Sequence, residues 1–68
     1  MQSGRLFFRI IESADGRWAC RRGRAEVDRH AEIDEALRHI TQIAAEHRPS
    51  QVWVHHLDGR VVVAADLA

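Results

Sequence analysis

Two short apolar runs flank an Asp58-Gly59 pair in the segment VWVHHLDGRVVV, residues 52–63. A two-residue hairpin turn of the primed types needs positive φ at its centre, which Gly tolerates and Asp accepts. The segment therefore predicts a β-hairpin, and counting outward from the turn sets its register. The pairs are Leu57 with Arg60, His56 with Val61, His55 with Val62, Val54 with Val63 and Trp53 with Ala64.

The N-terminal third predicts a second hairpin. Residues 5–12 are rich in Phe and Ile and alternate imperfectly, which favours a strand packed on both faces. Residues 14–17, Ala-Asp-Gly-Arg, have turn chemistry, and a second strand is expected over about 17–22. Residues 23–29 are polar and without a period, so we expect a connection there.

One helix is predicted within residues 31–48, where apolar residues recur at the three-and-four spacing of a helical face. Acidic residues crowd its first turn, where they favour the positive end of the helix dipole. Asp28 is the expected N-cap, and Pro49 ends the helix because it restricts the preceding residue. The predicted apolar face is Ile33, Ala36, Leu37, Ile40, Ile43 and Ala44.

These elements predict a single small α+β domain over residues 1–68, because so short a chain has room for only one core. The expected architecture is a two-layer β-β-α-β-β fold, a four-stranded, mainly antiparallel sheet with one helix packed on one face. Alternation along the strands divides each of them into two faces. The strand residues expected in the core are Leu6, Phe8, Ile10, Trp18, Cys20, Val52, Val54, Val61 and Val63.

The opposite face of this sheet is too apolar for a surface that meets only water. An antiparallel sheet covered on one side normally presents polar residues on the other, and a large exposed apolar patch marks an interaction site. Self-association is also a common way for so small a chain to gain stability. We therefore expect a non-enzymatic homodimer, with Arg5 and Arg9 at the rim of an interface formed by Phe7, Ile11, Trp53, His55 and Val62.

Charge is distributed unevenly, although the net charge is zero. Residues 1–24 hold six arginines and two acids, a balance of +4, whereas residues 25–68 hold four arginines and eight acids, a balance of −4. Basic residues interleaved with aromatic rings are typical of single-stranded nucleic-acid binding, which is the alternative function. Its expected contacts on the first hairpin are Arg5, Arg9, Arg17 and Arg21.

No catalytic, cofactor-binding or metal site is predicted. His55 and His56 are adjacent on a strand and point to opposite faces, and the other three histidines are eight and nine residues apart. The single cysteine, Cys20, has arginines beside it that would lower a thiol pKa, but it lacks a paired base, so core packing is expected.

The expected location is the cytoplasm. A single cysteine excludes an internal disulfide, and the chain has neither an apolar run of about 18 residues nor the apolar stretch of a secretory signal. A membrane is therefore not an expected partner, whereas a second protein remains open. All ten basic residues are arginine, a bias typical of a GC-rich bacterial genome.

The motifs Gly16-Arg17-Trp18-Ala19, residues 52–55 (Val-Trp-Val-His) and residues 58–60 (Asp-Gly-Arg) stand on either side of one amphipathic helix. In this arrangement the chain resembles a small bacterial family, domain of unknown function 2188. The resemblance spans nearly the whole chain and implies a strand, a GWAV-type strand, a helix and a VVHG-x-DG hairpin. His56 stands where that pattern has Gly. The resemblance implies a fold and no activity.

Overall fold

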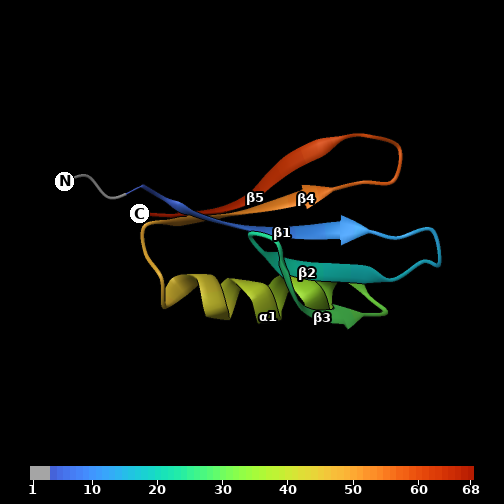
Figure 1. Cartoon of the computed structure of the whole chain (residues 1–68), viewed down its shortest axis with the longest axis horizontal. Helices are drawn as coiled ribbons and strands as arrows, with labels where there is room; N and C mark the ends of the chain where they lie inside the picture. The colour runs from blue at the N-terminus through green and yellow to red at the C-terminus, as the bar shows by residue number, and fades with distance from the viewer. Residues whose placement is uncertain (1–3) are drawn as a thin grey trace.

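The computed structural model describes residues 4–68, which form one mixed β-sheet with a single helix along one side (Figure 1). The α+β class is thus confirmed. The first three residues of the predicted 1–68 domain lie outside the described range. In chain order the elements are β1 (Leu6–Glu12), β2 (Trp18–Arg22), β3 (Ala25–His30), α1 (Ile33–Ala45), β4 (Ser50–His55) and β5 (Val61–Leu67).

The sheet has five strands in the order β3-β2-β1-β4-β5, rather than the four that were predicted. Strands β1 and β4 pair in parallel, and the other three pairings are antiparallel. Parallel neighbours need a long crossover connection, which β2, β3 and α1 provide here. The two hairpins are thereby joined through β1 and β4, and the first strand lies at the centre of the sheet.

Strand β3 occupies residues predicted to be a connection. It pairs with β2 at the edge of the sheet, and a bulge interrupts the register between Cys20 and Arg21. An edge strand needs few apolar residues, since one side of it meets solvent and charges there oppose edge-to-edge aggregation. The sequence AEVDRH therefore lacks the apolar alternation that identifies a central strand.

Helix α1 begins at Ile33, with Glu32 as N-cap in an extended conformation and without a side-chain capping bond. The prediction of Asp28 as the N-cap is wrong, because that residue belongs to β3. Ala36, Ile40 and Ala44 are buried on one stripe of the helix, as the spacing predicts. At 13 residues α1 is too short to cross a membrane, and the part of the chain described here contains no other helix.

Both hairpin turns contain the same sequence, Asp-Gly-Arg, and the same geometry. In the second hairpin the amide of His56 donates to the carbonyl of Arg60 at 2.8 Å, and the amide of Gly59 donates to the carbonyl of His56 at 3.0 Å. This is a three-residue loop with Gly59 at a φ of 97°. The predicted two-residue turn is wrong by one position, because the loop begins at Leu57 rather than at Asp58.

The longer loop shifts the register of β5 by one residue, which exchanges its faces. Val62 pairs with Val54, and Val61 and Val63 pair with His55 and Trp53. Val61 and Val63 were predicted in the core, as was Leu6, and all three are exposed. A second bulge between Val52 and Trp53 brings Ala65 and Leu67 against the core instead. The buried cluster is Phe8, Ile10, Cys20, Ala36, Ile40, Ala44, Val52 and Val54.

Ser50 is a fully buried polar residue that links β4 to the end of the helix. Its hydroxyl donates a hydrogen bond of 2.7 Å to the carbonyl of Ala44, which also accepts the amide of His47. We expect Ser50→Ala to lower the free energy of unfolding by about 1 kcal/mol, since the carbonyl keeps its other donor. Urea unfolding followed by circular dichroism measures this, and an unchanged midpoint would contradict the assigned contact.

Candidate functional site

The face of the sheet that the helix does not cover is called here the outer face. Alternation and register place on it Phe7, Arg9 and Ile11 from β1, Trp53 and His55 from β4, and Val61 and Val63 from β5. A groove of about 500 Å3 opens on this face. The residues that line it are Phe7, Arg9, Gly23, Trp53, His55 and Val61.

Four of the five predicted interface residues share the outer face: Phe7, Ile11, Trp53 and His55. The fifth, Val62, lies on the helix-bearing side, where it pairs with Val54, so its assignment to the outer face is wrong. The cause is the one-residue shift at the hairpin turn. Val61 and Val63 take its place, and they extend the apolar area to the edge of the sheet.

The four arginines proposed from the sequence as nucleic-acid contacts do not form one patch. Arg9 and Arg21 are direct neighbours across β1 and β2. Arg5 forms an ion pair with Asp66. Arg17 lies beyond the far end of β1, where it is bonded to Ser13, and at the rise of a strand it is roughly 26 Å from Arg5. The guanidinium groups of Arg9 and Arg21 also donate to the carbonyls of Gly23 and Arg24.

Acidic groups accompany these arginines on the outer face. Glu26 pairs with Arg21 in the register of β2 and β3, and it accepts two hydrogen bonds from Arg29. The bonds from Arg29 hold the pKa of Glu26 below its usual range. The face therefore carries an apolar centre and both signs of charge.

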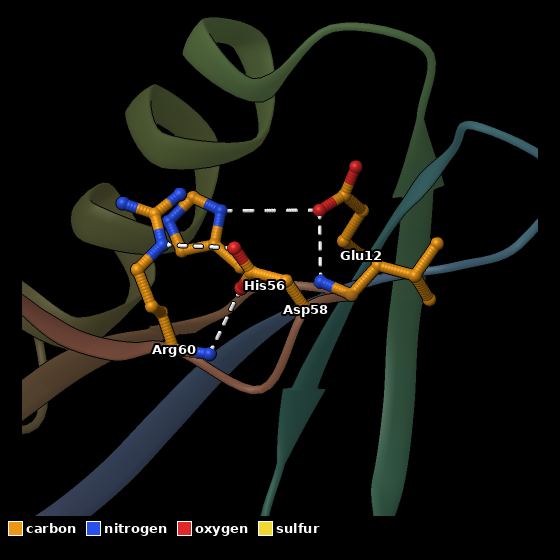
Figure 2. Close-up of polar contacts among 5 residues, drawn as sticks. Glu12, His56, Asp58 and Arg60 are labelled. Carbon is orange, nitrogen blue, oxygen red and sulfur yellow. Dashed lines mark hydrogen bonds and ion pairs between the residues drawn. The ribbon is translucent and has the colours of Figure 1, made fainter.

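A polar cluster holds the β4–β5 turn against the end of β1 (Figure 2). Glu12 Oε1 accepts the amide of Leu57 at 2.9 Å and lies 3.8 Å from His56 Nδ1. Asp58 accepts the amide of Arg60 at 3.0 Å, and this bond lowers the pKa of its carboxyl group. The ring of Trp18 meets His56 edge-on. Every contact stabilises the loop, so we assign this cluster a structural role.

Cys20 is fully buried on the helix-bearing side, as its predicted core role requires. Burial, and next the negative charge of Asp28, raise the pKa of its thiol to about 12. The arginines near it in the sequence do not lower this pKa, and Arg21 points to the outer face. Sequence reasoning missed that Asp28 and His30 lie close to this thiol, because their strand was interpreted as a connection, and that His39 of α1 lies beside Asp28.

Comparisons with known proteins give no match: no family model, no curated protein and no solved structure matches the chain. The resemblance to domain of unknown function 2188 therefore stays a prediction.

Proposed function

We propose that this protein is a non-enzymatic homodimeric module whose two copies pack through the outer face. The observation that carries the proposal is the apolar centre of that face. Phe7 is 50% exposed, and Val61 is 48% exposed, beside the half-buried ring of Trp53. Rings and valines grouped on one open face are typical of the centre of an interface, where aromatic anchors contribute most of the binding free energy.

A second copy of the chain suits this face better than a partner of one charge. A two-fold interface packs the same surface against itself, so that a residue away from the axis meets a different residue of the other copy. The outer face carries both Arg9 and Glu26 around its apolar centre, so opposite charges are available on each side. The net charge of zero also adds no long-range repulsion between copies.

Binding of single-stranded nucleic acid is the alternative function. The observation in its favour is that Arg9 and Arg21 stand side by side next to Phe7 and Trp53, which could stack on bases. This alternative is weakened because Arg5 is paired with Asp66 and because Arg17 lies at the other end of β1 from Arg5. This alternative predicts binding that falls steeply with salt, because phosphate contacts release counterions.

The shifted register offers a matched pair of variants that tests the dimer. Val61 and Val62 are adjacent on β5 and are 48% and 46% exposed, but they point to opposite faces. We expect Val61→Glu to give a monomer, since it places a charge in the apolar centre of the interface. Val62→Glu should remain a dimer. Sedimentation equilibrium measures both masses, and circular dichroism checks that both variants fold.

Two results would contradict the proposed interface. Val61→Glu could remain a dimer of wild-type affinity, or Val62→Glu could dissociate to the same extent as Val61→Glu. The second result would point to pairing along the edge of β5, which involves both residues equally. Retention of a labelled oligonucleotide at low salt by a monomeric wild-type protein would support the alternative function.

A further inference from the structure

Four side chains with metal-binding chemistry meet between the edge of the sheet and the helix. Cys20 of β2 is the register partner of Asp28 of β3, and His30 lies two residues further along the same face of β3. His39 projects from α1, three residues after Ala36, whose carbonyl accepts the Cys20 thiol at 3.8 Å. The strand pairing and the packing of the helix thus bring residues from three elements together, although Cys20 and His39 are 19 positions apart in the sequence.

The potential ligand atoms are already close to one another. Those of Cys20, Asp28 and His30 all lie within 4.8 Å. His30 Nε2 is 3.1 Å and His39 Nδ1 is 2.6 Å from the same oxygen, Asp28 Oδ2. Ligands of a tetrahedral zinc ion are about 3.3–3.8 Å apart, given metal–ligand bonds of about 2.0–2.3 Å. Cys20, Asp28 and His30 are therefore placed to share an ion, and His39, which lies beside Asp28, can join them by a rotation of its side chain.

Three polar atoms of this cluster are not satisfied by hydrogen bonds within the described residues. Asp28 Oδ1, His30 Nε2 and His39 Nδ1 are buried atoms without a hydrogen-bond partner in residues 4–68. The two short contacts to Asp28 Oδ2 lack the alignment of a hydrogen bond, although their distances are short enough. Buried polar atoms without partners are costly, and each one calls for an explanation. Two imidazole nitrogens that converge on one carboxylate beside a thiol are the arrangement expected around a shared cation.

We propose that a divalent transition-metal ion of the zinc class binds at this point, and that its ligands are Cys20, Asp28, His30 and His39. Thiolate, imidazole and carboxylate together are the ligand types that zinc takes in proteins, whereas calcium and magnesium take oxygen. Four protein ligands make a closed site of the structural kind. The ion fastens the polar edge strand β3 to β2 and to α1. His39, which is partly exposed, lies on the side open to solvent.

Titration of the metal-free protein with Co2+ in place of zinc tests the site. Cobalt bound by a thiolate has a charge-transfer absorption in the near ultraviolet, which reports Cys20 directly. We expect one equivalent of Co2+ to produce this band at neutral pH, and zinc to displace it. His39→Gln, a change at a partly exposed helix position, should weaken binding at least about tenfold without unfolding the chain. Asp28→Asn should weaken it similarly.

His47→Gln is the matched control, because His47 follows the other end of the helix, where its ring meets Phe8. This variant should bind Co2+ as the wild-type protein does. The proposal is overturned if one equivalent of Co2+ produces no thiolate band in the wild-type protein. It is also overturned if His39→Gln binds with unchanged affinity, or if His47→Gln weakens binding as much as His39→Gln does. In those cases the cluster is a polar network without a metal.

Discussion

Phe8→Ala is expected to remove a third or more of the stability of the fold, about 3–5 kcal/mol. Phe8 is fully buried at the centre of the sheet, where β1 lies between β2 and β4. Truncation of a buried Phe costs about 3–5 kcal/mol through lost burial and the cavity left behind. A chain of 68 residues has a total stability of only about 3–10 kcal/mol. Urea unfolding followed by circular dichroism measures the loss.

Phe7→Ala is the matched control, one position earlier on the same strand and on the outer face. Both variants should be made in the Val61→Glu background, so that loss of the dimer does not enter the comparison. There Phe7→Ala should cost less than about 1 kcal/mol, because the ring is half exposed in the monomer. Equal losses for the two variants would contradict the assignment of faces along β1.

Stability is expected to fall as the pH rises from 9 towards 12. The thiol of Cys20 has a pKa of about 12 in the folded protein against 9.0 for an unperturbed thiol. In this range the unfolded chain loses its proton first, so deprotonation favours unfolding, and the full stability is present only below pH 9. The difference of three pKa units amounts to about 4 kcal/mol at pH 12.

The composition leaves few other side chains that titrate in this pH range. The chain contains neither tyrosine nor lysine, the side chains that ordinarily titrate near pH 10. Cys20→Ala is the control, since it removes the thiol. Urea midpoints at pH 8, 10 and 11, measured with a chelator and a reductant present, should fall in the wild-type protein and stay nearly constant in Cys20→Ala. Equal slopes for both proteins would contradict the account of the buried thiol.

The elements with strong apolar periodicity could be predicted from the sequence, and the edge strand could not. The helix around Ile40 buries one continuous stripe and the strand around Phe8 buries one face, so the spacing of their apolar residues identifies both elements. Strand β3 has no such stripe, since its exposed side carries Glu26 and Arg29 and its inner side carries Asp28 and His30. The cluster around Cys20 depends on that strand, and it was therefore beyond the reach of spacing rules.

The second failure, the register of the last hairpin, has a local cause. Asp-Gly suits both a two-residue turn and the end of a three-residue loop, and the two differ by one position in every pair. Here the side chain of Asp58 accepts the amide of Arg60, and Glu12 holds the amide of Leu57 from outside the hairpin. The second contact comes from a residue 45 positions away, so the local sequence does not contain it.

The solution mass of the purified wild-type protein, measured by light scattering at low and at high salt, tests the proposed dimer most directly. The chain has a mass of 7.8 kDa, and the account predicts twice that value at both salt concentrations, because contact through Phe7, Trp53 and Val61 is mainly apolar. A mass of one chain at both salt concentrations, at protein concentrations up to the millimolar range, would contradict it.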